Sequence, residues 1–128
     1  MNIETFQGGY DKNFSYLIWC DKTKIAAIID PSVRHLPILQ HIEKLNLQLQ
    51  KIIITHTHFD HYQYLSDYLF YFPNIEICCY KNSINLFKEY NVRGVVNNEV
   101  LSLGETLLIS LHTPGHFHDS ICYWDKKN

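Results

Sequence analysis

The sequence lacks several features that would assign the chain to a broad class of protein. Its 128 residues contain 11 Lys and Arg against 13 Asp and Glu, and this formal net charge of -2 gives no electrostatic basis for binding nucleic acid or an anionic membrane. No apolar run approaches the ~20 residues that cross a bilayer. The first residues, MNIE, lack the basic and apolar regions of a signal peptide. These absences predict a cytoplasmic protein without a nucleic-acid or membrane partner.

Cysteine pairs with the spacing of redox or metal motifs are also missing. None of the four cysteines forms a Cys-x-x-Cys pair, and three of them lie inside apolar, strand-like runs. We therefore expect buried free thiols in a reducing compartment rather than a disulfide framework. No internal repeat, low-complexity tract or linker divides the chain. The length suits a single domain over residues 1–128 with a core of its own.

Strand-like and helix-like segments alternate along the chain. Short apolar or β-branched runs predict strands, and apolar residues at helical spacing predict helices. The expected strands cover residues 14–19, 25–29, 51–55, 75–80, 100–103, 106–112 and 120–124. The expected helices cover residues 33–46, 62–72 and 83–90, the last with Ser83 or Asn82 as its cap, and residues 91–98 are expected to be irregular. This alternation predicts an α/β fold.

The densest group of chemically informative residues directly follows the predicted strand at 51–55. Residues 55–61 read THTHFDH, which places His56, His58, Asp60 and His61 within six residues. An extended backbone puts the rings of His56 and His58 on one side, while Asp60 and His61 lie where the chain turns toward a second point. Neutral imidazole and carboxylate suit zinc, iron or manganese. The run therefore predicts one or two adjacent metal positions and, with them, a metal-dependent hydrolase.

Two residues elsewhere in the chain are candidates to complete this site. His116 ends the turn TPGH at residues 113–116, which also follows a predicted strand, and α/β sites gather beyond the carboxyl ends of strands. Taken alone, such a turn would hold an exposed histidine. Asp30 ends an apolar strand, where its carboxylate could orient a liganding imidazole or simply form the turn before Pro31.

The other histidines are expected to lie outside the site. His118 follows His116 closely and is either an extra ligand or, as we favour, a surface residue of the loop. His112, His35 and His41 are interpreted as structural or solvated side chains, because the first precedes the turn on its strand and the other two lie on a predicted helix.

With both loops considered in order, the chain resembles the metallo-β-lactamase superfamily. Residues 55–61 match the H-x-H-x-D-H motif of that family, and residues 113–116 followed by SICY at 120–123 resemble its second metal loop. The segment IIDP at residues 28–31 resembles the family's strand-end aspartate, and NFSYLI at residues 13–18 resembles its opening strand. The resemblance implies an αββα sandwich, of which this chain would hold the N-terminal half, and it is strongest to the glyoxalase II-like branch.

The resemblance also implies a ligand set and a reaction. One metal, expected to be zinc with iron or manganese as alternatives, would take His56, His58 and His116. A second would take Asp60 and His61, and Asp60 is expected to be catalytic. Asp30 would orient a liganding histidine. A bridging hydroxide would attack the carbonyl of a small-molecule substrate, a thioester or a related ester.

The departures from the family pattern leave other readings open. The bridging aspartate of a later Gly-Asp segment and a further histidine are not found in these 128 residues, and Tyr62, Gln63 and Asp119 stand where many members have small residues or glycine. Tyr62 could crowd the pocket or contact substrate. The alternatives are a non-catalytic remnant that binds a metal or a partner, and an iron oxygenase of the persulfide dioxygenase kind. A half sandwich would expose apolar sheet, so we expect a homo-oligomer or a separate C-terminal half as partner.

Overall fold

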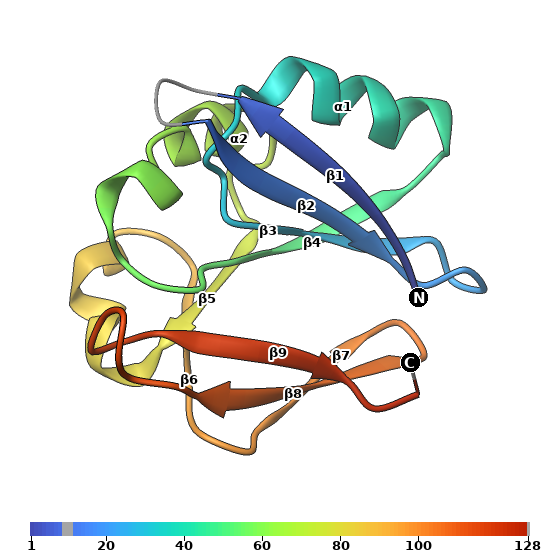
Figure 1. Cartoon of the computed structure of the whole chain (residues 1–128). Coiled ribbons are helices and arrows are strands. Elements are labelled where there is room, and N and C mark those ends of the chain that lie inside the picture. Colours follow the sequence, from blue (N-terminus) through green and yellow to red (C-terminus); the bar gives the residue numbers. More distant parts are fainter. Residues whose placement is uncertain (9–11, 128) are drawn as a thin grey trace.

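The computed structural model describes residues 1–8 and 12–127, which form two β-sheets beneath two helices (Figure 1). The larger sheet has six strands in the order β1-β2-β3-β4-β5-β6, and the smaller has three in the order β7-β8-β9. The strands are β1 (Asn2–Gly8), β2 (Asn13–Trp19), β3 (Ile25–Ile29), β4 (Gln48–Ile53), β5 (Glu76–Tyr80), β6 (Val92–Val95), β7 (Val100–Leu103), β8 (Thr106–His112) and β9 (Ile121–Asp125). The helices are α1 (His35–Lys44) and α2 (Leu65–Tyr71), with 3₁₀ segments η1 (Phe59–His61) and η2 (Lys81–Phe87).

The pairing of the strands decides where the loops of the large sheet meet. β1, β2 and β3 pair antiparallel, whereas β3, β4, β5 and β6 run parallel to one another. α1 connects β3 to β4, and α2 lies between β4 and β5, as expected for crossovers between parallel strands. The carboxyl ends of β3 and β4 therefore lie side by side, which brings the loop after Ile29 next to the loop after Ile53.

Successive residues of the central strands pack on opposite faces of the large sheet, as the two-residue repeat of a strand requires. Ile52 packs on the face covered by α1 and α2, and its neighbour Ile53 packs against the small sheet. Both side chains are fully buried, and burial of such a side chain contributes about 1.5–3 kcal/mol. The core between the helices and the large sheet also contains Leu17, Ile28, Ile38, Ile42, Tyr68 and Ile77. The core between the two sheets contains Ile18, Ala27, Cys78, Leu101, Leu103, Leu108 and Ile121.

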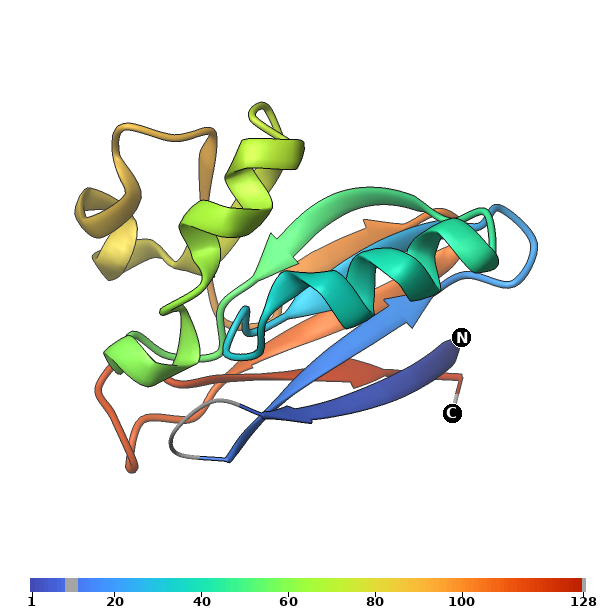
Figure 2. The same cartoon turned by 90° about the horizontal axis from the view of Figure 1, so that it is seen from above.

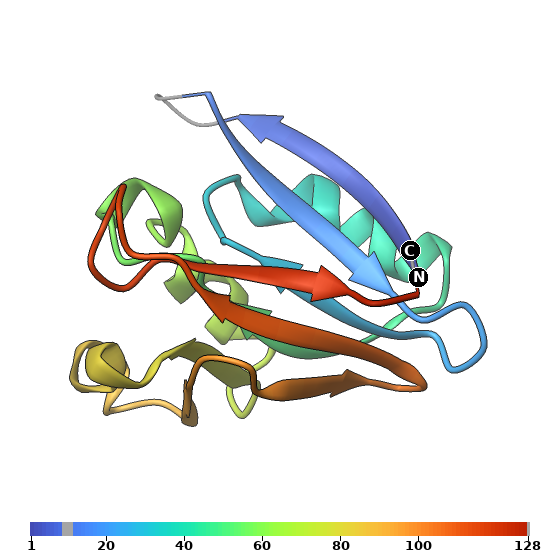
Figure 3. The same ribbon diagram turned by 60° about the horizontal axis from the view of Figure 1, so that its bottom comes forward.

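The layers are thus helices, large sheet and small sheet, and they confirm the predicted α/β class. Figure 2 shows both helices lying over one face of the large sheet. Figure 3, from the opposite side, shows the strands of the small sheet crossing in front of the other face. Part of the inner face is therefore covered within the chain itself, by β7, β8 and β9. Self-association through the remaining surface stays a prediction.

Two strands were not predicted, and both lie at edges of the large sheet. β1 pairs antiparallel with β2 along its whole length, but most of its side chains are exposed, so its sequence carries no apolar run. β6 occupies part of residues 91–98, which we expected to be irregular. It is four residues long and contains Gly94, whose missing side chain lets Lys81 and Ile84 of η2 approach. An exposed edge strand such as β1 and a very short one such as β6 both lack the periodic signal on which the prediction depended.

Two helix predictions also need correction. The helix expected over residues 62–72 begins only at Leu65, because residues 62–64 form a turn after the 3₁₀ segment η1. The helix expected over residues 83–90 is the 3₁₀ segment η2 at Lys81–Phe87. Ser83 lies inside η2 and does not cap it; its hydroxyl instead donates to Asp119, 36 positions further along the chain.

All four cysteines are free thiols, which agrees with the sequence prediction. Cys20, Cys78 and Cys79 are buried, whereas Cys122 on β9 is exposed. Burial raises the pKa of the thiols of Cys78 and Cys79 to about 12, so both stay protonated at neutral pH. Among the described residues, no helix is long and apolar enough to cross a membrane.

Candidate metal centre

The predicted ligands lie in two loops that meet beyond the carboxyl ends of β3 and β4. His56 and His58 follow β4, and His116 lies in the loop between β8 and β9. A backbone hydrogen bond of 2.8 Å from the Ile121 N–H to the Thr55 carbonyl joins the start of β9 to the start of the histidine run. This contact places a loop of the small sheet against a loop of the large sheet, so the site lies between the two.

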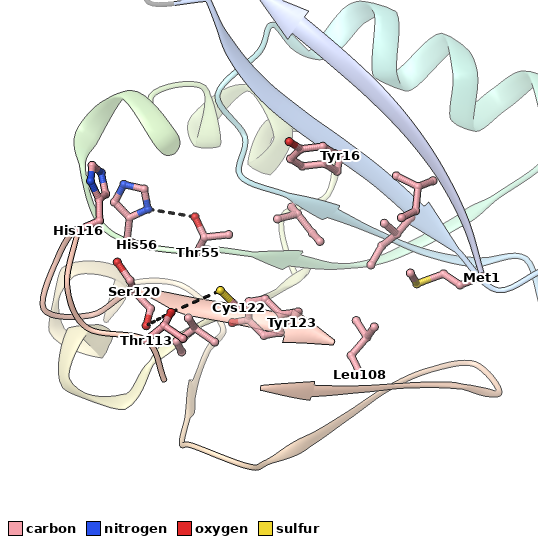
Figure 4. Close-up of a pocket in the computed structure, with 14 residues that line it drawn as sticks. Met1, Tyr16, Thr55, His56, Leu108, Thr113, His116, Ser120, Cys122 and Tyr123 are labelled. Carbon is pink, nitrogen blue, oxygen red and sulfur yellow. Dashed lines mark hydrogen bonds between the residues drawn. The ribbon is translucent and has the colours of Figure 1, made fainter. Parts of the chain in front are cut away.

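Three imidazoles converge on one point. One nitrogen each of His56, His58 and His116 lies within 4.8 Å of the others. The His56 ring centroid is 4.9 Å from each of the other two centroids, and the rings meet edge to face. Figure 4 shows His56 and His116 beside each other at the end of the cavity described below. His56 is buried and His116 is exposed, so the group has an inner wall and a side that faces solvent.

Hydrogen bonds determine which nitrogen of His56 is left for a ligand. The Thr55 hydroxyl donates its one proton to Asp30 Oδ2 over 2.6 Å, so its oxygen can only accept from His56 Nδ1, 3.1 Å away. His56 Nε2 then carries a lone pair. That atom is buried and has no hydrogen-bond partner among the described residues. A buried nitrogen without a partner is costly unless a cation or donor meets it, so the group fits a metal ion.

Asp30 lies where the sequence predicted a partner for a liganding imidazole, and its carboxylate contacts both Thr55 and His61. The residue is 4% exposed and adopts a left-handed backbone conformation with φ +55°, which aspartate tolerates better than most residues. Its carboxylate accepts hydrogen bonds from the Thr55 N–H over 2.7 Å and from the Thr55 hydroxyl, and it lies 2.9 Å from His61 Nδ1. One buried carboxylate therefore orients both His56, through Thr55, and His61 directly.

Asp60 and His61 lie next to the three-histidine group but have protein partners of their own. The Asn13 side chain donates to Asp60 Oδ2 over 2.7 Å. His61 Nε2 is 4.0 Å from the same Asp60 oxygen, and the ring centroids of His61 and His56 are 4.1 Å apart. The pair is thus near the expected second metal position. The atoms that converge within 4.8 Å are, among the described residues, those of the three-histidine group only.

The pKa values of His56 and His61 shift in opposite directions. Burial, followed by the charge of His61, lowers the pKa of His56 below its ordinary value of 6.5. The hydrogen bond to Asp30, assisted by the charges of Asp30 and Asp60, raises the pKa of His61 despite its partial burial. The hydrogen bond from Asn13 is the main reason that the pKa of Asp60 lies below its usual range. His56 is consequently the neutral imidazole that a metal requires, and Asp60 is ionised.

The other histidines lie outside the converging group, as predicted. His112 stacks on Tyr80 with ring centroids 4.1 Å apart, and its Nε2 lies 3.0 Å from the carbonyl oxygen of His118. His118 itself is exposed. On α1, His35 lies against the rings of Tyr68 and Tyr71, and His41 lies against Phe6 and Trp19.

Tyr62 does not line the cavity beside the histidines that is described below, and a contact with substrate stays a prediction. Its ring meets Phe59 at a centroid distance of 5.4 Å and Phe87 at 5.3 Å, both edge to face. These contacts join it to the core between the helices and the large sheet.

Asp119 is a further candidate residue of the site, and its contact with the histidine run was not predicted from the sequence. It is 2% exposed and accepts hydrogen bonds from Thr57, the residue between His56 and His58. In the sequence it is an ordinary polar loop residue. The one available signal was its presence where many relatives carry glycine.

A cavity of about 520 Å³ opens beside the histidines. Figure 4 shows His56 and His116 at one end of it and Met1 and Leu108 toward the other. Its walls are largely apolar, but the buried hydroxyls of Ser120 and Tyr123 line it without a hydrogen-bond partner among the described residues. The cavity thus offers space for an apolar group, with two unused hydroxyls and the histidine group as its polar features.

The sequence profile of the metallo-beta-lactamase superfamily matches residues 8–128. The chain belongs to that superfamily. It is 38% identical over 119 residues to a probable hydroxyacylglutathione hydrolase of Schizosaccharomyces pombe. The aligned region covers 91% of this chain and 44% of the relative. It is 29% identical over 113 residues to a probable polyketide biosynthesis zinc-dependent hydrolase of Bacillus subtilis, covering 87% of this chain and 50% of the relative. These relatives confirm the superfamily and the glyoxalase II-like branch.

The fold agrees with this assignment. The crystal structure of ETHE1 from Myxococcus xanthus superposes with a TM-score of 0.81 at 28% identity, covering 98% of this chain and 54% of that one. The chain therefore spans about half the length of each of these three proteins.

Proposed function

We propose that this chain forms the metal-binding part of a zinc hydrolase that cleaves a thioester or a related ester. The observation that carries the proposal is the convergence of His56, His58 and His116 around a buried His56 Nε2 that has no partner of its own. Three protein ligands with one remaining position are the usual arrangement of a catalytic zinc. The names of the hydroxyacylglutathione hydrolase and the zinc-dependent hydrolase among the relatives support the substrate class and the metal.

The residues of the chain would divide the work as follows. Asp30 and Thr55 hold His56 in the tautomer that presents Nε2. Asn13 fixes the carboxylate of Asp60 beside the group and holds its pKa below the usual range. A zinc ion held there would supply a nucleophilic water with a pKa of about 7 and would polarise a carbonyl. The exposed side of the group at His116 and the adjoining cavity would receive the substrate, a small molecule in the cytoplasm.

Elemental analysis of the chain, purified without added metal, tests the proposal together with a hydrolysis assay on a hydroxyacylglutathione thioester. Zinc at about one equivalent with turnover is the expected result. Zinc without turnover would contradict catalysis by this chain and limit the proposal to the metal site. Iron in place of zinc would favour the oxygenase alternative. No metal at all would overturn the proposal and favour a non-catalytic remnant.

A further inference from the structure

Asp119 joins three segments of the chain behind the histidine group. It lies in the same loop as His116, and its carboxylate is buried. Oδ1 accepts the backbone N–H of Thr57 over 3.2 Å, and Oδ2 accepts the Thr57 hydroxyl over 2.6 Å. Oδ2 also accepts the hydroxyl of Ser83 in η2 over 2.7 Å. A single side chain thus ties the second histidine loop to the first and to η2.

The position of Thr57 makes this contact informative. Thr57 separates His56 from His58, and in extended backbone the middle residue points away from its two neighbours. Binding both the N–H and the hydroxyl of Thr57 therefore fixes the residue that links the two ligands His56 and His58. Because Asp119 is three residues from His116, the same contact also sets how far His116 lies from the other two histidines.

Asp30 makes the same pair of contacts with Thr55, the threonine that precedes His56. It accepts the N–H and the hydroxyl of Thr55 over 2.7 and 2.6 Å. Each threonine that precedes a histidine in Thr-His-Thr-His is therefore held by its own buried aspartate. The two aspartates come from different sheets: Asp30 follows β3 of the large sheet, and Asp119 precedes β9 of the small sheet.

From this geometry we infer that Asp119 is a positioning residue for the three-histidine metal group, acting through Thr57. The inference rests on the metal site proposed above. Asp119 does not contact the converging nitrogens. It holds the His56–His58 segment and the His116 loop in register, so that the three nitrogens are already close together before a metal ion binds. Preorganised ligands bind a metal more tightly because less freedom is lost on binding.

The test is zinc affinity of the metal-free chain, measured by competition with a chromophoric chelator. Asp119→Asn turns one acceptor oxygen into a donor that opposes the Thr57 and Ser83 donors, and we expect the zinc Kd to rise about 10- to 100-fold. Thr57→Val should raise it about tenfold, and Thr57→Ser, which keeps the hydroxyl, should restore wild-type affinity. The visible absorption of the cobalt-substituted chain should shift in Asp119→Asn and Thr57→Val but not in Thr57→Ser.

Ser83→Ala is the matched control, because it removes one hydrogen bond to Asp119 but leaves both contacts between Asp119 and Thr57 in place, and its Kd should stay within about twofold of wild type. Urea unfolding of each metal-free variant separates stability from affinity. Unchanged zinc Kd in both Asp119→Asn and Thr57→Val, even with lower stability, would overturn the inference. If Asp119→Asn does not fold, the comparison of Thr57→Val with Thr57→Ser decides alone. A wild-type chain that binds no zinc would overturn both this inference and the proposed function.

Discussion

The three-histidine group and the Asp60–His61 pair occupy adjacent parts of one site but are prepared for a cation in different ways. His56 leaves a buried nitrogen without a partner and has a lowered pKa. His61 and Asp60 are already engaged, by Asp30 and Asn13 respectively, and the pKa of His61 is raised. The first region is therefore an assembled group of imidazoles in which the buried Nε2 of His56 is available to a cation. In the second region, the side chains of His61 and Asp60 already have hydrogen-bond partners within the protein, Asp30 and Asn13.

The comparison teaches that the residues of one ligand motif need not contribute equally to a metal site. All four residues of the motif belong to one short run, yet only two of them, with His116 from a distant loop, converge among the described residues. We expect the first ion to bind without a contribution from the pair.

The largest expected effect is that of removing a ligand from the assembled group. Wild-type chain should carry about one equivalent of zinc at neutral pH, and His58→Ala should carry essentially none, because only two protein ligands remain. Elemental analysis of both proteins measures this. His118→Ala is the matched control, since it removes an exposed histidine from the His116 loop, and it should retain its zinc. Equal zinc in His58→Ala and wild type would refute the three-histidine assignment.

A smaller effect is expected from Asp30→Asn, which leaves every ligand in place. The amide can no longer accept at both oxygens, so the Thr55 hydroxyl and the ring of His56 lose their fixed orientation. Zinc affinity should fall about 10- to 100-fold, as is usual when the partner of a liganding histidine is removed. Chelator competition measures the change in Kd.

Asn13→Ala separates the two regions. Its contact with Asp60 lies outside the three-histidine group, so the Kd for the first zinc ion should stay within about twofold of wild type. The same competition assay applies. A loss as large as that in Asp30→Asn would show that the two regions bind a metal as one unit, against the comparison drawn above.

Much of this site could be predicted from the sequence because its ligands belong to residue types that rarely cluster without a cation. His56, His58 and His116 were predicted to share a metal, and the structure brings their nitrogens together. The strand-end position of Asp30 suggested an orienting role, and parallel pairing of β3 with β4 explains how it reaches Thr55. The α/β class followed from the alternation of strands and helices.

The contacts of Asp119 could not be predicted, because they depend on how the two sheets pack. Asp119 and Thr57 are 62 positions apart, and neither lies in a periodic segment. The alternation of threonine and histidine over residues 55–58 is visible in the sequence, but a threonine beside a histidine has no preferred partner until the fold supplies one. The edge strands β1 and β6 were missed for a different reason: β1 is largely exposed and β6 is only four residues long, so neither carries an apolar run.

The smallest expected effect is a difference in proton affinity between the two regions in the metal-free chain. Histidine side chains titrate near 6.5 when unperturbed; His61 should titrate above this value and His56 below it. For His61 the folded state holds its proton more tightly, so its contribution to stability is present below 6.5 and is lost as pH rises through the raised pKa. For His56 the unfolded state takes up the proton first, so stability falls as pH drops from 6.5 toward the lowered pKa.

Proton NMR of the imidazole resonances, assigned with His61→Ala and His56→Ala, measures both pKa values. In Asp30→Asn the pKa of His61 should fall toward 6.5, because its main hydrogen bond is lost. If His56 and His61 titrate at the same pH in the wild-type chain, the distinction drawn between the three-histidine group and the Asp60–His61 pair is wrong.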